Sequence, residues 1–121
     1  MPVQRDRFEF KTALLAELEA ARARHQTRTY RQMIDRLALP SPAMRTLTAA
    51  LEALAQEDVE AGRPVRAALV VSQAGSGLPR PGFFECLAAL GACPAELDEA
   101  GMHAWHAAEL RRVFATENPD I

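Results

Sequence analysis

Hydrophobic side chains recur at helical spacing along most of the chain. Between residues 6 and 25, one expected face carries residues three or four apart: Phe10, Leu14, Leu18, Ala21 and His25. This spacing places side chains above one another on a helix, and the abundant alanine and leucine favour the same conformation. The segment is therefore predicted to be an amphipathic helix over residues 6–25, with Asp6 as its cap.

A second, shorter helix is expected over residues 30–38. Thr29 can cap its first turn with a hydroxyl oxygen. Its expected inner face is made of Tyr30, Met33, Ile34 and Leu37. The segment "LALPSP" ends this helix, because Pro40 lacks an amide donor and restricts the residue before it.

A third helix is expected to follow at once. Ser41 followed by Pro42 is typical of a helix start, with a capping hydroxyl and then a proline at the first helical position. Its expected inner stripe is made of Met44, Leu47, Leu51 and Leu54. Gly62 is the expected stop. Together, residues 29–61 have the outline of a helix-turn-helix.

The segment after Gly62 changes character. The run "AALVVS" at 67–72 is short, apolar and partly β-branched, which predicts a buried strand. The following "QAGSGLPRPG" holds three glycines and two prolines, so an irregular loop is expected, from which a second strand or extended segment returns. A short helix over 83–90 and a last helix, opened by Pro94 and ending near Ala115, complete the pattern.

This order of elements is that of a winged helix-turn-helix, in which the second helix of the motif enters the major groove and a β loop touches the flanking backbone. The predicted fold is mainly α with a small β element: a winged helix-turn-helix-like domain with additional N- and C-terminal helices. A single domain is expected over residues 1–121. Its expected parts are an N-terminal helix (6–25), the helix-turn-helix (29–61), a strand and wing-like loop (66–82) and C-terminal helices (83–115).

Composition agrees with an ordinary soluble domain, since 49% of the 121 residues are hydrophobic and 25% are charged. The longest apolar runs are far shorter than a membrane span, and the N-terminus lacks the apolar core of a secretory signal. Cys86 and Cys93 lack CxxC spacing and are interpreted as reduced thiols. A cytoplasmic protein without membrane contact is expected.

Charge is unevenly distributed although the net charge is only −2. Six arginines lie between residues 22 and 45, with Asp35 as the only acid there, whereas acids dominate residues 85–121. A neutral total can hide a basic face, and the local field is what a nucleic-acid backbone would meet. The alternative is that these arginines only solvate helix surfaces.

The stretch "TYRQMIDRLALPSPAMRTLTAAL" resembles the C-terminal winged-helix domain of the O6-alkylguanine-DNA alkyltransferases and alkyltransferase-like proteins, which carry a "TYGELA…LG…AARAVG…AL" pattern. Thr29 and Tyr30 match "TY", residues 43–47 stand where "AARAVG" would stand, and residues 50–51 match "AL". The resemblance covers roughly residues 27–72. It implies that Tyr30 helps to rotate a target nucleotide out of the duplex and that Arg45 inserts into the base stack.

The resemblance ends where the chemistry of that family lies. The family continues with a Pro-Cys-His-Arg segment, whereas Pro64 is followed here by neither a cysteine nor a histidine. Cys86 and Cys93 lie in later elements, so no activated thiolate is expected and alkyl transfer is not implied. The segment "LVVSQAGSGLPRPGFF" also resembles small bacterial proteins and nuclease-associated domains with an "LVV…GLPG.GFF" pattern, to which no activity is attached.

The candidate nucleic-acid-binding residues are Tyr30, Arg45, Arg28, Arg31, Arg36 and Arg80. Arg45 would approach bases from the start of the third helix, Arg28, Arg31 and Arg36 would hold phosphates, and Arg80 would act from the wing-like loop. The alternatives remain open that Arg45 is merely exposed, that Tyr30 packs its ring in the core, and that the loop anchors Phe83 and Phe84. Acids in the back half of the third helix would repel phosphate: Glu52, Glu57, Asp58 and Glu60.

Catalytic and metal-binding residues are not expected. Glu99, His103 and His106 could ligate a metal, but three ligands on one helix make a poor site. No Ser-His-Asp arrangement is discernible, so an enzyme has little support and no cofactor is expected. The first hypothesis is a non-catalytic, DNA-binding or regulatory domain whose partner is double-stranded DNA. The second is a protein-interaction or homodimerisation domain that keeps the winged-helix shape without binding DNA.

Overall fold

The computed structural model describes residues 7–73 and 76–116, and the side chains of 9–73 and 76–116. Within this part, the protein is mainly helical with a small β element. Its elements in chain order are α1 (Arg7–Ala23), β1 (Arg28–Thr29), α2 (Tyr30–Leu37), α3 (Ala43–Ala61), the 3-10 turn η1 (Arg66–Leu69), β2 (Val70–Val71), α4 (Pro81–Ala89) and α5 (Glu99–Ala115).

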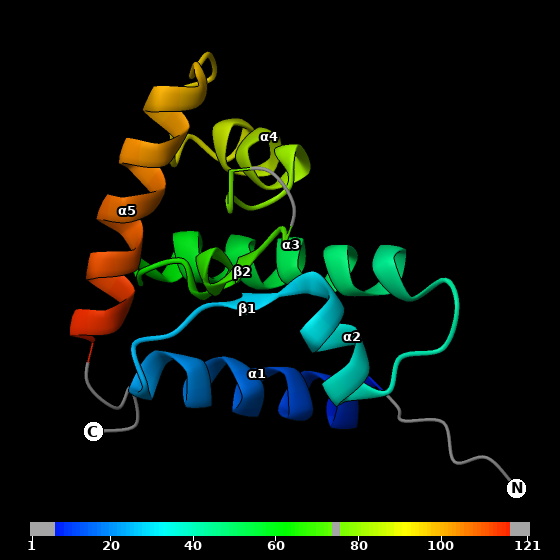
Figure 1. The fold of residues 1–121 in the computed structure, drawn as a ribbon. Coiled ribbons are helices and arrows are strands. Elements are labelled where there is room, and N and C mark those ends of the chain that lie inside the picture. The colour runs from blue at the N-terminus through cyan, green and yellow to red at the C-terminus, as the bar shows by residue number, and fades with distance from the viewer. Residues whose placement is uncertain (1–6, 74–75, 117–121) are drawn as a thin grey trace, which may run out of the picture.

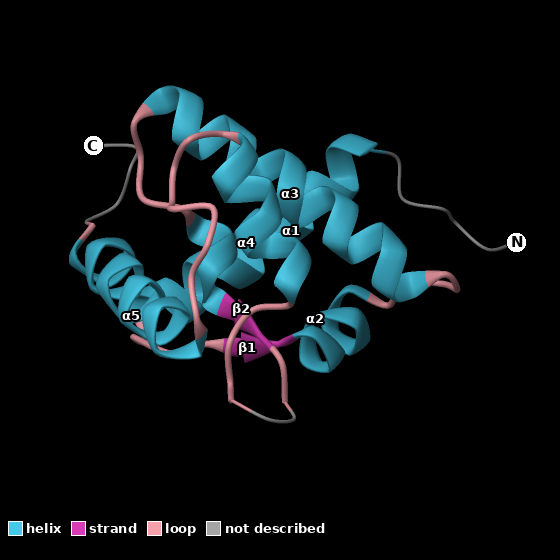
Figure 2. Ribbon diagram, turned by 90° about the horizontal axis from the view of Figure 1, so that it is seen from above, coloured by secondary structure: helices cyan, strands magenta, loops and turns pink. Residues whose placement is uncertain are grey.

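The helices are arranged around η1 and the two short strands. α3 crosses the middle of the molecule with α1 on one side and α4 on the other, while α5 closes one end (Figure 1). Seen from above, α2 and α5 lie on opposite sides of the strand pair (Figure 2). η1 packs against α1, α3 and α5, so the segment after α3 forms the centre of the fold.

The predicted start of the second helix is confirmed. Thr29 caps α2 with a capping box: its hydroxyl accepts a hydrogen bond from the Gln32 amide at 3.1 Å, and its own amide donates to the Gln32 side chain at 2.9 Å. This arrangement satisfies two amide donors that a helix start otherwise leaves unpaired. The predicted stop of the third helix is also confirmed, because Gly62 caps α3 with a φ of +72°.

Four predicted helix boundaries are wrong. α4 begins at Pro81, a proline at the first helical position, rather than at residue 83. α3 begins at Ala43 after a cis Ser41–Pro42 peptide bond, and Ser41 does not cap it. α5 begins at Glu99 rather than near Pro94, because Asp98 accepts the Gly101 amide and caps the helix. α1 ends at Ala23, and His25, which was expected on its inner face, is exposed with a φ of +53°. The predicted cap Asp6 lies outside the described residues.

The β element differs from the predicted strand and wing. Residues 66–69 form a 3-10 turn, and only Val70 and Val71 are in strand conformation. β2 pairs in parallel with β1, which precedes α2, and not with a strand returning from the loop. In the described part of the chain, residues 76–80 form no second strand; Ser72 donates its amide to the Leu78 carbonyl at 2.9 Å and closes the loop.

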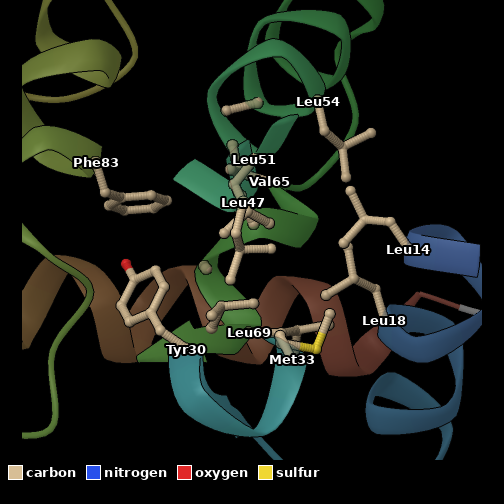
Figure 3. Close-up of a cluster of buried hydrophobic side chains, with 14 of the residues drawn as sticks. Leu14, Leu18, Tyr30, Met33, Leu47, Leu51, Leu54, Val65, Leu69 and Phe83 are labelled. Carbon is tan, nitrogen blue, oxygen red and sulfur yellow. The ribbon is translucent and has the colours of Figure 1, made fainter. Parts of the chain in front are cut away.

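One hydrophobic core joins the helices. Tyr30 and Phe83 lie at one end of the cluster and Leu14 and Leu18 at the other, with Leu47 between them (Figure 3). The alternative in which Phe83 and Phe84 anchor the loop in the core is confirmed, since both side chains are buried. Their rings contact each other edge to face with centroids 5.2 Å apart.

Charged groups complete the centre of the fold. Asp58 is fully buried, and its carboxylate accepts hydrogen bonds from the Arg63 side chain and from both the backbone amide and the side chain of Arg66. Glu109, also buried, accepts the Val65 amide at 2.7 Å. These acceptors hold the chain between α3 and η1, where regular secondary structure leaves backbone amides unpaired.

Candidate nucleic-acid interface

Two candidate arginines are free to meet a partner. Arg45 lies in the first turn of α3 and Arg31 in the first turn of α2, and both side chains are exposed. Neither guanidinium forms an ion pair or side-chain hydrogen bond with the residues that the structure describes. A guanidinium that is exposed and has no existing partner can contact a phosphate or a guanine edge at a small free-energy cost, because no other contact has to break first.

Tyr30 connects the start of α2 with the loop before α4. Its hydroxyl accepts a hydrogen bond from the Arg80 amide at 2.9 Å, and the Arg80 guanidinium lies 6.0 Å from the centre of the Tyr30 ring. The ring is only 6% exposed, and burial raises the pKa of Tyr30 above its ordinary value. The ring is thus packed in the core, whereas the guanidinium of Arg80 remains at the surface.

A pocket of about 370 Å³ opens between α3 and α4 beside this contact. Tyr30, Leu51, Ala67 and Phe83 supply apolar walls, and the polar lining residues are Thr48, Glu52, Arg80 and Cys86. Volumes of this order, with apolar walls and a few polar groups, are typical of ligand pockets in proteins. The structure therefore brings Tyr30 and Arg80 together at one pocket, near the same end of the core as Phe83 (Figure 3).

Cys86 is the only thiol in this pocket wall, and its environment does not activate it. Burial, followed by the negative charge of Glu52, raises the pKa of the Cys86 thiol. The thiol is therefore protonated at neutral pH, and a protonated thiol is a weak nucleophile. Ala67, in the segment after Pro64, also lines the pocket and offers no nucleophile.

The other two candidate arginines lie away from this pocket. Arg28 is only 7% exposed, and its Nη1 donates to the Gln26 side chain and the Thr27 carbonyl. Arg36 lies five residues after Arg31 on α2, which places it on another side of the helix. Its guanidinium is 3.6 Å from the Glu17 carboxylate of α1. Arg28 and Arg36 line a separate cavity.

Acids limit the usable length of α3. Glu52, Glu57 and Glu60 are exposed in its second half, as expected, and Glu57 forms an ion pair with Lys11 at 2.8 Å. Asp58 is different, because it is buried against Arg63 and Arg66 and contributes nothing to the surface. Arg45 is the one cationic residue of α3, and it lies in the N-terminal turns, before the first acid of this helix, Glu52.

The candidate metal ligands of the last helix do not converge. The His103 Nε2 lies 3.8 Å from the Glu99 carboxylate, whereas His106 points into the fold and its Nε2 lies 2.8 Å from the Ala68 carbonyl oxygen. Among the described residues, no group of three or more histidine, cysteine, aspartate or glutamate side chains could hold a metal ion.

Sequence reasoning missed several residues that shape these sites. Glu52 and Cys86 in the first pocket, and Arg24, Gln32 and Phe114 in the second cavity, were not singled out as ligand-facing residues. A signal existed for the buried Asp58, because it continues the inward stripe of Leu47, Leu51 and Leu54 at helical spacing. The pockets themselves join elements distant in sequence and leave no local pattern.

Comparison with known proteins does not add to this picture. No protein-family model matches the chain, and no match was found among the curated proteins or the solved structures. Within the described residues, no helix combines the length and the apolar character that crossing a membrane requires.

Proposed function

We propose that this protein is a non-catalytic domain of helix-turn-helix type that binds double-stranded DNA through α2 and α3. The observation that carries the proposal is the exposed guanidinium of Arg45 in the first turn of α3, directly after the capped helix α2. This guanidinium has no ion pair or hydrogen bond with any described residue. The N-terminal end of the second helix of such a motif is where base edges are contacted. Arg31 would hold a neighbouring phosphate.

The pocket between α3 and α4 gives the proposal a second element. Arg80 stands at its rim and would meet the flanking backbone as a wing does, while the apolar walls could receive an extruded base. Such a base would stack on or beside the Tyr30 and Phe83 rings. The raised pKa of Cys86 supports a binding role without covalent chemistry.

A second candidate function is a protein-interaction or homodimerisation domain that does not bind DNA. The exposed acids Glu52, Glu57 and Glu60 on α3 favour it, because they would repel a phosphate backbone along half of the helix. A basic partner or a second copy would then cover this surface.

Fluorescence anisotropy with a labelled duplex of mixed sequence tests the proposal. The wild-type protein should bind at ~50 mM salt and lose affinity steeply by ~200 mM, since each neutralised phosphate releases counterions. Arg45→Ala should weaken binding about tenfold, the range of one good arginine–guanine contact.

Arg111→Ala is the matched control, because Arg111 is also exposed, lies on α5 and has no ion pair with described residues. It lowers the net charge by the same amount, and should change affinity less than about twofold. Absence of binding at ~50 mM salt, or equal losses in Arg45→Ala and Arg111→Ala, would contradict the proposal. Salt-independent self-association in the same samples would favour the second candidate.

A further inference from the structure

A second cavity, of about 580 Å³, lies where the end of α1, β1, the outer side of α2 and the end of α5 meet. Three arginines line it: Arg24, Arg28 and Arg36. Among the residues that the structure describes, none with an acidic side chain lines it. This cavity shares no residue with the pocket at Tyr30 and does not include Arg45.

Arg28 has hydrogen-bond donors for which the described part of the chain supplies no acceptor. Its Nη1 donates to the Gln26 Oε1 at 3.1 Å and to the Thr27 carbonyl at 3.3 Å. Its Nε is buried and has no hydrogen-bond partner among the described residues, and the residue as a whole is only 7% exposed. Its Nη2 also makes no hydrogen bond with described residues, so one edge of the planar guanidinium, Nε with Nη2, has no acceptor within the described part of the chain, whereas its geometry suits a bidentate one.

An unpaired buried donor on a charged group is costly, and native structures rarely leave one without a reason. Here the donor is held in place: β1 pairs Arg28 with Val70, and Gln26 and Thr27 fix the other side of the guanidinium. A fixed fork of this kind matches the geometry of carboxylate and phosphate oxygens.

The neighbouring charges select a doubly charged ligand. The Arg24 guanidinium is exposed and has no partner among described residues. Arg36 makes only a long ion pair, with its Nη1 3.6 Å from the Glu17 carboxylate. Gln26 and Gln32 use their side-chain oxygens for Arg28 and Thr29, so that their amide NH₂ groups are available as further donors. Up to three cations and several neutral donors exceed what one carboxylate can use.

We propose that this cavity binds a phosphomonoester, with the phosphate oxygens on the Nε–Nη2 edge of Arg28 and on Arg24 and Arg36. A phosphomonoester carries a charge close to −2 at neutral pH and three strong acceptor oxygens, which fits this set of donors. His25 and Phe114 stack on each other at the cavity wall, with centroids 5.0 Å apart and planes 11° from parallel. They offer apolar and aromatic surface to the organic part of the ligand.

The test is a titration followed by amide chemical shifts, at pH ~7.5 where the phosphomonoester is mostly dianionic. Inorganic phosphate and adenosine monophosphate are added at constant ionic strength, with adenosine and sodium chloride as blanks. Both phosphates should give saturable shifts, strongest for the amides of residues 24–28, 32 and 114. Adenosine and chloride should give none there.

Three variants distinguish phosphate binding in this cavity from a general effect of the protein's charge. Arg28→Gln should weaken phosphate binding at least about tenfold, because it removes a charge-assisted bidentate contact. Arg24→Gln, at an exposed position, should weaken it several-fold without affecting the fold, which keeps the proposal testable if Arg28→Gln does not fold. Arg111→Gln removes an equal charge from α5 and should leave binding unchanged.

Absence of saturation by ~20 mM of either phosphate, or equal weakening by Arg111→Gln and Arg24→Gln, would overturn the proposal. A 5′-phosphorylated single strand and its unphosphorylated form then distinguish the two sources of a phosphomonoester. Phosphate-dependent binding of the strand would assign a nucleic-acid end, and binding of adenosine monophosphate alone would assign a free nucleotide. This outcome is independent of Arg45, so it can fail while DNA binding stands.

Discussion

The hydroxyl of Tyr30 accepts a hydrogen bond from the backbone amide of Arg80 across fifty positions of sequence, at 2.9 Å. This single bond joins the first residue of α2 to the loop that leads into α4. It also fixes Arg80 at the rim of the pocket that Tyr30 and Phe83 help to form. Tyr30, to which the alkyltransferase resemblance assigns a role, is therefore also a residue that shapes the pocket.

Tyr30→Phe should destabilise the protein by about 1 kcal/mol, the ordinary net value of one hydrogen bond whose donor is left partly buried. The ring remains in the core, so packing is preserved. Chemical denaturation measures the change, and Arg80→Ala, which keeps the amide and removes the side chain, is the control. A larger loss in Arg80→Ala than in Tyr30→Phe would contradict the assignment of the stabilisation to the Tyr30–Arg80 backbone bond.

Tyr30 is the only tyrosine in the chain, so its ionisation can be followed directly by ultraviolet absorbance. Burial raises the pKa of Tyr30 from an ordinary value of 10.0. The neutral phenol is thus favoured in the fold: its contribution is complete below about pH 10 and is lost as the pH rises above that value. The folded protein should titrate at higher pH than the same chain in denaturant. Coincident curves would show an exposed phenol.

Asp58→Ala should destabilise the protein by about 2–3 kcal/mol, because the buried carboxylate accepts charge-assisted bonds from two arginines and the Arg66 backbone amide. Since Arg63 and Arg66 are partly exposed, their charges can regain water and the loss stays below that of a fully buried pair. Denaturant unfolding measures it. Glu60→Ala, at an exposed site of the same helix, should cost less than about 0.5 kcal/mol.

His106 should make stability depend on pH. Burial lowers the pKa of His106 from an ordinary value of 6.5, so the fold favours the neutral ring. Its contribution is complete above about pH 6.5 and is lost as the pH falls below this value towards the folded pKa, because the unfolded chain takes up the proton first.

The measurement is the stability difference between wild type and His106→Gln at about pH 8 and about pH 5.5. The advantage of the wild type should shrink at the lower pH. His103→Gln, on the exposed side of α5, is the control and should show a smaller change. If the stability difference between wild type and His106→Gln is the same at both pH values, the burial of a neutral His106 ring is contradicted.

Much of the helical fold could be predicted from the sequence, because its signals are local. The Thr29 capping box and the Gly62 stop depend on residues within one turn, and both are confirmed. Ser41 has the local chemistry of a cap, but Pro42 occupies the N-cap position of α3 and no side chain caps this helix. The last helix was predicted to begin at Pro94, but α5 begins at Glu99 and Asp98 caps it.

The β pairing and the cavities could not be read in this way. β1 is only Arg28–Thr29, too short for any periodicity, and its parallel pairing with β2 arises from the packing of η1 among α1, α3 and α5. Along the chain, the six candidate residues, five arginines and Tyr30, were interpreted as one nucleic-acid-binding set. In the fold, Arg28 and Arg36 belong to one cavity, Tyr30 and Arg80 to another, and Arg45 and Arg31 to the open surface.

The central claim, that α2 and α3 form a DNA-binding surface, is tested most directly by mapping amide chemical shifts during titration with a mixed-sequence duplex at ~50 mM salt. The account predicts shifts that gather on residues 30–31, 45–48 and 80–82, and that fade as the salt concentration rises. Absence of shifts, or shifts confined to α5 and the second half of α3, would contradict it.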